Sequence, residues 1–205
     1  MQSNLLAEKW AQGITYAAYR QLMQDLEARQ QTTGPNQSEA MVHYTQLNAR
    51  RMHRLDKSVR LREDLKDLLR KLRRPCHWLV LTEAWCGDAA QILPVLAAMS
   101  EVGSIIELRL LLRDEHLDLM DEFLTDGARA IPKLIAIDAD SGDVVGTWGP
   151  RPEPARAMLR AFRQRAQGSK EELARDLQLW YARDKTATIQ AELMACLQTW
   201  EGVRA

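Results

Sequence analysis

The sequence predicts an α/β fold in which a central mixed sheet of about four strands is flanked by helices. Between about residues 75 and 130, apolar runs typical of buried strands alternate with stretches of helical periodicity, which is a βαβ pattern. Two short strand-like runs follow at 133–138 and 144–148, joined by the turn-forming stretch 139–143. These last two strands should therefore be antiparallel. Helical stretches before and after this region predict N- and C-terminal helical extensions.

The N-terminal extension contains two helical stretches. Apolar residues recur with helical spacing over 15–30, where Thr15 is a suitable N-cap. The stretch 31–38 has turn residues without an apolar anchor, so we expect an exposed connection. Helical spacing resumes over 39–72, with a break expected near 56–58.

The α/β part begins after Pro75, because proline disfavours helix at the residue before it. A strand is expected over 77–82, a helix over 86–101, a second strand over 105–112 and a short helix over 115–124. The hairpin of the strands 133–138 and 144–148 follows this helix.

A helix over 153–165 completes the predicted core, and the chain restarts as helix at Gly168-Ser169. One unbroken helix from there would be about 45 to 50 Å long, which exceeds the diameter of a small domain. The helix must therefore bend, protrude, or pack on the N-terminal helices.

The chain divides into an N-terminal arm (1–74), an α/β core (75–165) and a C-terminal extension (166–205). A length of 205 residues suits one good core with appendages. We expect all three segments to pack as one unit.

Composition excludes several classes of function. Lys and Arg number 28 and Asp and Glu number 28, so the net charge of zero gives no reason to expect nucleic acid as a partner. No apolar run approaches the roughly 20 residues that cross a bilayer, and no leader is apparent, so we expect no membrane association and a cytoplasmic location. Cys76, Cys86 and Cys196 form neither a disulfide framework nor, with the four histidines, a metal site.

Cys86 is the candidate catalytic nucleophile, because it falls where the first predicted strand meets a helix. Unpaired N–H groups and the helix macrodipole favour negative charge at that position. Cysteines there commonly have a lowered pKa and react at neutral pH.

The order of elements and four separate features resemble the thioredoxin superfamily. The Trp-Cys-Gly sequence of residues 85–87 matches the active-site turn, and Pro94 matches a proline that kinks the following helix. Ile131 and Pro132 stand where the superfamily has its cis-proline, and Gly149 resembles the glycine that closes the active-site face. The resemblance implies a thioredoxin-like fold over the core.

Both arms resemble those of a bacterial thioredoxin-like subgroup whose site reads Thr-Glu-x-Trp-Cys-Gly-Asp-Ala. Segments 47–57 and 180–185 also occur there, which implies that the arms belong to the same folded unit. The implied site consists of Cys86 lined by Trp85, Gly87, Asp88 and Ala89.

Departures from the superfamily pattern change the expected chemistry. Ala89 replaces the resolving cysteine, and Val80 stands where thioredoxins commonly hold a buried aspartate. Cys76 lies on the order of 25 Å away along the strand, and Cys196 would approach only if the C-terminal helices covered the site. Asp88 is either an anion that opposes the Cys86 thiolate or a plain acid at a helix start.

The resemblance also implies a docking edge for substrate. The backbone of Ile131 would bond an extended substrate segment, while Pro132 keeps that edge open beside the sulfur. A trans proline in an ordinary turn is the alternative.

The arms carry two further patterns. Arg51, Arg54 and Lys57 recur every three positions and would favour a thiolate or an anionic substrate such as glutathione, or else form a solvated helix face. The aromatic residues Trp180, Tyr181 and Trp200 indicate helix packing first and a homodimer contact second.

These features favour a monothiol thiol–disulfide exchange protein in which Cys86 attacks a protein or low-molecular-weight disulfide. An external thiol such as glutathione would then resolve the adduct as a co-substrate, and no other cofactor is expected. If no resolver reaches the adduct, the chain would act as a reversible thiol sensor. The competing interpretation is a redox-inactive thioredoxin-fold module whose arms recognise another protein. Iron–sulfur binding is a weaker third interpretation, because the Cys-Gly-Phe-Ser pattern of monothiol glutaredoxins is missing.

Overall fold

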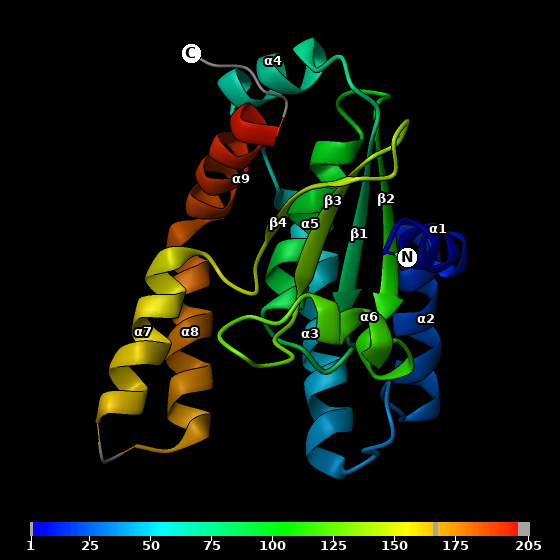
Figure 1. Ribbon diagram of the computed structural model, residues 1–205. Helices are drawn as coiled ribbons and strands as arrows, with labels where there is room; N and C mark the ends of the chain where they lie inside the picture. Colours follow the sequence, from blue (N-terminus) through cyan, green and yellow to red (C-terminus); the bar gives the residue numbers. More distant parts are fainter. Residues whose placement is uncertain (1, 166–167, 201–205) are drawn as a thin grey trace.

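The computed structural model describes residues 2–165 and 168–200 (Figure 1). The strands are β1 (Cys76–Thr82), β2 (Ile106–Leu112), β3 (Lys133–Asp138) and β4 (Val144–Trp148). The helices are α1 (Gln2–Gln12), α2 (Tyr16–Arg29), α3 (Glu39–Ser58), α4 (Glu63–Lys71), α5 (Ala89–Ser100), the 3₁₀ turn η1 (Arg113–Glu115), α6 (Leu117–Glu122), α7 (Glu153–Gln164), α8 (Lys170–Asp184) and α9 (Ala187–Trp200).

The four strands form one mixed sheet in the order β2-β1-β3-β4. β1 runs parallel to β2, with Leu79 opposite Arg109, and antiparallel to β3, with Leu79 opposite Ile135. β4 pairs antiparallel with β3 across a bulge between Ala136 and Ile137. The predicted mixed sheet with an antiparallel final hairpin is confirmed.

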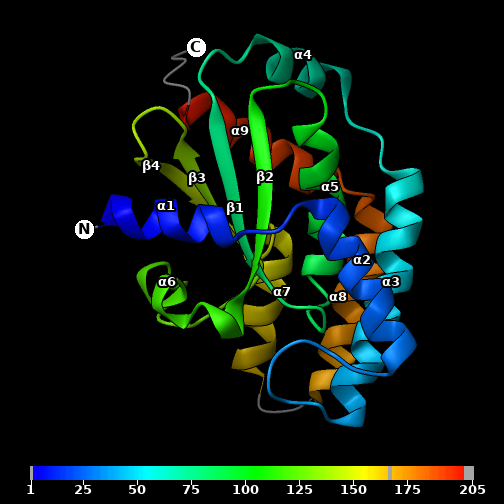
Figure 2. The same ribbon diagram turned by 90° about the vertical axis from the view of Figure 1, so that its right-hand side faces the viewer.

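Helices cover both faces of the sheet. α3, α5 and α8 lie on one side, whereas α1 and α6 lie on the other (Figure 2). α5 is apolar on almost every side because it lies between the sheet and the helices α3 and α9, and all its residues from 89 to 97 are buried. One hydrophobic cluster extends from Leu6 in the N-terminal arm through Trp78 to Leu197 in the C-terminal extension.

Local sequence accounts for several helix boundaries. Thr15 caps α2, and its side chain accepts a hydrogen bond from the Ala18 N–H at 3.2 Å. α3 ends at Ser58 and α4 begins at Glu63, so the expected break is present. Ser169 and Glu172 form a capping box at the start of α8.

Two N-terminal features differ from the sequence-based expectations. α1 was not predicted; it is held by tertiary contacts, since the Trp10 ring stacks on His77 at 3.9 Å and the Arg109 guanidinium lies 4.8 Å from the Trp10 ring centre. The 31–38 connection is not wholly exposed, because Thr32 and Thr33 are buried. Their hydroxyls bond groups in α3 and in the turn after β1.

The C-terminal extension bends instead of forming one long helix. α8 ends where Lys185 and Thr186 adopt positive φ angles of 50° and 70°, and α9 then turns back onto β4. The Trp148 indole N–H donates to the Glu192 carboxylate at 3.0 Å, which fixes α9 to the sheet. α7 and α8 lie side by side and project beyond the sheet (Figure 1). Among the described residues, no helix has the length and apolar character required to cross a membrane.

Candidate active site

The site is built on the turn between β1 and α5, which contains residues 83–88. β1 is buried from Trp78 onward and delivers the chain to the edge where β1 and β2 end. α5 begins at Ala89, so Cys86 lies just before the first helical turn, as the strand-to-helix pattern predicts. Its carbonyl accepts from the Ala90 N–H at 3.2 Å, which continues the helical bonding into the turn.

The Cys86 thiol is a buried, protonated group. Its Sγ donates to the Ile131 carbonyl at 3.4 Å and receives a long hydrogen bond, 3.5 Å, from the Ala89 N–H. Burial, followed by the negative charge of Asp88, raises the pKa of Cys86 to about 12. The expectation of a lowered pKa is therefore wrong. Desolvation of the anion outweighs the stabilisation from the backbone N–H groups of Ala89 and Asp88 and from Arg151.

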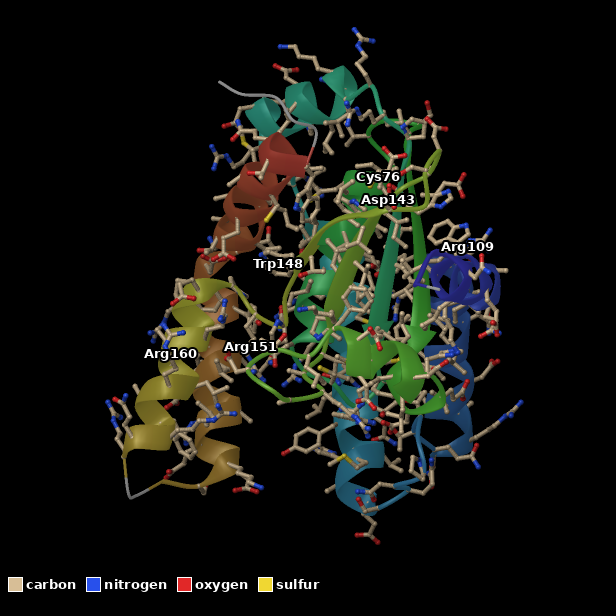
Figure 3. The ribbon with its side chains drawn as sticks, in the orientation of Figure 1. Cys76, Arg109, Asp143, Trp148, Arg151 and Arg160 are labelled. Atoms are coloured by element: carbon tan, nitrogen blue, oxygen red, sulfur yellow. The ribbon has the colours of Figure 1, made fainter. Side chains whose placement is uncertain are left out.

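Asp88 is a buried member of a polar cluster and not a plain acid at a helix start. Its carboxylate lies 2.6 Å from the Arg151 guanidinium and accepts from the Tyr181 hydroxyl at 2.9 Å. Burial raises the pKa of Asp88, against the lowering effect of Arg151. Burial lowers the pKa of Arg151, but the neighbouring Asp88 carboxylate leaves it above its ordinary value, so the pair retains a protonated guanidinium. Figure 3 shows Arg151 between α7 and the sheet.

The N-terminal arm holds the backbone of the active-site turn. The Ala84 N–H donates to the Thr33 hydroxyl at 2.9 Å, and the Asn48 amide donates to the Ala84 carbonyl at 2.9 Å. Arg51 donates in turn to the Asn48 side-chain oxygen at 2.8 Å. Buried turns need partners for their backbone groups, and these side chains supply them.

The C-terminal extension holds the other half of the turn. The Gln178 amide donates to the Gly87 carbonyl at 3.3 Å, and its oxygen accepts from Gln91 of α5 at 2.6 Å. Tyr181, one helical turn further along α8, bonds Asp88. Both arms therefore converge on the segment that carries Cys86.

A cleft of about 870 Å³ leads to the thiol. It lies between α3, the active-site turn, α7 and α8, and Trp85, Cys86, Gly87 and Asp88 line it. Cys86 is only 7 % exposed, but it lines the cleft. A substrate would therefore reach the thiol through the cleft. The Arg113 guanidinium lies 5.0 Å from the Trp85 ring centre and helps to hold that ring.

The edge around Pro132 is closed, which differs from the open docking edge implied by the resemblance. The Ile131–Pro132 peptide bond is cis, and both residues are buried. The Ile131 carbonyl, the expected substrate acceptor, already accepts the Cys86 thiol. Gly149 has φ +112°, and a Cβ there would lie 2.3 Å from the Pro132 carbonyl oxygen, so glycine is required for this close approach.

The remaining residues of interest lie apart from the thiol. Cys76 begins β1 and pairs with Ile106 and Asp138, at the far end of the strand from the turn. Cys196 is on α9, which packs on β4, and it does not line the cleft. Val80 is fully buried in the core. Ala89 is buried beside Cys86, so no thiol among the described residues is positioned to resolve an adduct.

Sequence reasoning missed the role of four residues in the site, and each of these residues lies outside the turn. Arg151 had no local signal beyond its position after Gly149. Asn48 and Tyr181 fall in segments 47–57 and 180–185, whose resemblance to the bacterial subgroup was the available signal. Thr33 lay in a segment interpreted as exposed. Among the described residues, no group of three or more His, Cys, Asp or Glu side chains is arranged to hold a metal ion.

Comparisons with known proteins agree with this architecture. No curated protein matches the chain. A crystal structure of an HIV epitope scaffold matches with a TM-score of 0.59 and 20% identity, covering 94% of this chain and 96% of that chain. A protein of unknown function from Pseudomonas aeruginosa matches with a TM-score of 0.62 and 21% identity, again over 94% and 96%. Identities this low show the fold alone.

A family model described as thioredoxin matches residues 34–167, which is more than half of the chain. The matched segment includes α3, the whole sheet, the Cys86 turn and α7. The chain therefore belongs to the thioredoxin family.

Proposed function

We propose that the protein is a monothiol thiol–disulfide exchange protein, in which Cys86 reacts with a disulfide that enters the cleft. The observation that carries this proposal is the position of Cys86, which lines the roughly 870 Å³ cleft at the active-site turn of a thioredoxin fold. A small disulfide or a polypeptide segment fits a cavity of this size.

The reaction balances with the single thiol. The Cys86 sulfur bonds one sulfur of the substrate, the substrate disulfide breaks, and the proton of Cys86 passes to the leaving thiolate. Because Ala89 stands in place of a second cysteine, a second thiol molecule must attack the mixed disulfide. That attack returns the Cys86 thiol and forms a new disulfide between the resolver and the substrate fragment.

Glutathione fits the role of resolver because Arg51 and Arg163, neither of which is ion-paired to a carboxylate of the described residues, both line the cleft and would bind its carboxylates. The three free cysteines fit a reducing compartment such as the cytoplasm. We further propose that the chain belongs to the bacterial single-cysteine subgroup with the Trp-Cys-Gly-Asp-Ala site.

Exchange by this thiol is slow at neutral pH. With a pKa of about 12, about one molecule in 10⁵ carries the thiolate at pH 7. Turnover therefore depends on a substrate that stays bound in the cleft long enough for the rare thiolate to attack.

The decisive experiment measures adduct formation by intact mass. A Cys76→Ser/Cys196→Ser variant leaves Cys86 as the single cysteine, and incubation with glutathione disulfide should add one glutathione, which reduced glutathione then removes. Adding Cys86→Ser to the same background is the matched control. Absence of an adduct after prolonged incubation at pH 8 to 9 would refute the exchange function.

A second candidate function is a redox-inactive module that binds another protein. Two observations favour it: the raised pKa of Cys86, and the closed edge at Ile131. In that case Cys86 is a structural thiol, and Cys86→Ser retains every partner interaction.

The Ala89→Cys variant separates the two candidates. Ala89 follows the cysteine at the spacing of a dithiol site, and its N–H already contacts Sγ. A working exchange site should form an internal disulfide and gain dithiol reductase activity. Retention of two free thiols under oxidising conditions would favour the binding module.

A further inference from the structure

The wall of the cleft that faces away from the sheet is an apolar helix surface that α8 covers only in part. α7 is strongly amphipathic, yet Ala155 is its one buried residue among those described. Leu159 and Phe162 lie on its cleft side and stay partly exposed, while Leu179 of α8 is 49 % exposed. Met41 of α3 faces the same space. A largely apolar cleft with a few polar side chains at its edge is typical of a binding site.

Positive charge surrounds this apolar surface, although the whole chain is neutral. Arg51, Arg163 and Lys170 line the cleft, and the latter two form no ion pair within residues 2–165 and 168–200. Two acidic residues line it as well, Asp88, which Arg151 already neutralises, and Glu171. The site therefore combines an apolar surface with an excess of exposed cations.

We propose that the cleft between α3, α7 and α8 is a docking groove for a polypeptide segment that alternates apolar and acidic residues around a cysteine. This proposal extends the proposed function, because it names the substrate class for Cys86. The occupant is a polypeptide and not an acyl chain because partly exposed side chains such as Leu159 and Leu179 leave the groove open to solvent. An acyl chain would require an enclosed cavity.

The dimensions suit an extended segment. α7 has 12 residues and is about 18 Å long at 1.5 Å per residue. About six extended residues at 3.3 Å each span that length. Their apolar side chains would cover Leu159, Phe162 and Leu179, and their carboxylates would reach Arg163 and Lys170.

Binding is measured with Cys86→Ser protein, so that thiol chemistry does not contribute. The probe is a fluorescein-labelled peptide of about eight residues in which leucine and glutamate alternate around a central serine. A second probe carries lysine in place of glutamate. Fluorescence anisotropy at low salt should show binding about tenfold tighter for the glutamate peptide, and the difference should shrink at high salt.

Matched variants locate the peptide on the protein. Arg163→Glu should weaken binding of the glutamate peptide about two- to fivefold, whereas Arg160→Glu, on the same helix but outside the cleft, should not (Figure 3). Leu179→Ser should weaken binding about fivefold, whereas Leu124→Ser, which changes another exposed leucine away from the cleft, should not.

Several results would overturn this docking groove. Equal binding of the two peptides, or equal effects of Arg163→Glu and Arg160→Glu, would contradict the charge selection. A homodimer in sedimentation that Leu179→Ser dissociates would assign the surface to a second copy of the chain. Glutathionylation of Cys86 without peptide binding would support the exchange function and refute the docking groove. Peptide binding without glutathionylation would support the docking groove and refute the exchange function.

Discussion

The Cys86 thiol and the Asp88 carboxylate share a small buried region with Arg151, which bonds Asp88 directly, and with the more distant charge of Arg51. Because Arg151 bonds the carboxylate directly, it offsets part of the cost of burying that anion, whereas the thiol has no such partner and remains neutral. The Cys86 proton is held by the Ile131 carbonyl. The surroundings of Cys86 therefore favour the protonated thiol over the thiolate.

The alkylation rate of Cys86 should report this competition. In the Cys76→Ser/Cys196→Ser background, the rate with iodoacetamide should rise about tenfold per pH unit beyond pH 10, because the thiolate fraction keeps increasing below a pKa of about 12. A plateau below pH 9 would contradict the raised pKa.

Asp88→Asn should lower the pKa of Cys86 and speed alkylation at pH 8 about three- to tenfold, since it removes the adjacent negative charge and leaves Arg151 unpaired. Asp118→Asn is the matched control, because Asp118 pairs with Lys9 in α1, away from the thiol. An unchanged or slower rate in Asp88→Asn would show that the carboxylate does not act on Cys86.

The same raised pKa predicts a loss of stability at high pH. Between about pH 9.0, where an unfolded thiol ionises, and about pH 12, the folded state binds more protons at Cys86 than the unfolded state. Stability should therefore fall as pH rises through this window, by at most about 4 kcal/mol. The free energies of unfolding of the wild type and of Cys86→Ala, measured with urea, should become more similar as the pH rises. A constant difference between the two proteins across this pH range would contradict the prediction.

At the scale of elements, the helices of both arms position a few polar side chains that bond the active-site turn. α3 presents Asn48 to the Ala84 carbonyl, and α8 presents Gln178 and Tyr181 to Gly87 and Asp88. The bend at Lys185 and Thr186 lets α8 reach the turn while α9 packs on β4. Without that bend one of these two contacts would be lost.

The packing of α9 on β4 can be tested by adding a single methyl group at Gly146 of β4. A Cβ at Gly146 would lie 1.8 Å from the Trp200 indole nitrogen, so Gly146→Ala should destabilise the protein by about 1 to 3 kcal/mol. Adding Trp200→Ala should make the Gly146→Ala change nearly neutral. Additive effects of the two substitutions in urea unfolding would contradict a direct clash.

At the scale of the whole molecule, the arms and the α/β core share one hydrophobic cluster and one polar site. Leu6, Trp78 and Leu197, from the three segments, belong to that cluster. The active-site turn bonds both arms. Shared burial of this kind couples the segments energetically, so they should unfold together.

Thermal unfolding should therefore show one transition by far-UV circular dichroism and by tryptophan fluorescence. Asn48→Ala leaves the Ala84 carbonyl without its donor and should lower the free energy of unfolding by about 1 to 3 kcal/mol in that single transition. Asn36→Ala, in the exposed part of the loop, is the control and should have little effect. Two separate transitions would show that the arms fold independently.

Most of the fold could be predicted from the sequence because the patterns that specify its strands, helices and turns are local. The run at 77–82, the hairpin at 133–148 and the Thr15 cap depend on periodicity and turn chemistry within a few residues. α1 escaped prediction because its partners, His77 and Arg109, are distant in sequence. Burial of Thr33 escaped for the same reason.

The sequence by itself determined the thioredoxin architecture, the position of Cys86 at a strand-to-helix turn and the loss of a resolving thiol at Ala89. Only the tertiary structure decided the protonation state of that thiol and its route to solvent. The pKa of a cysteine depends on desolvation and on nearby charges, and here these come from burial, from Asp88 and from Arg151. The cleft likewise exists only because α7 and α8 fold back beside α3, which no local pattern encodes.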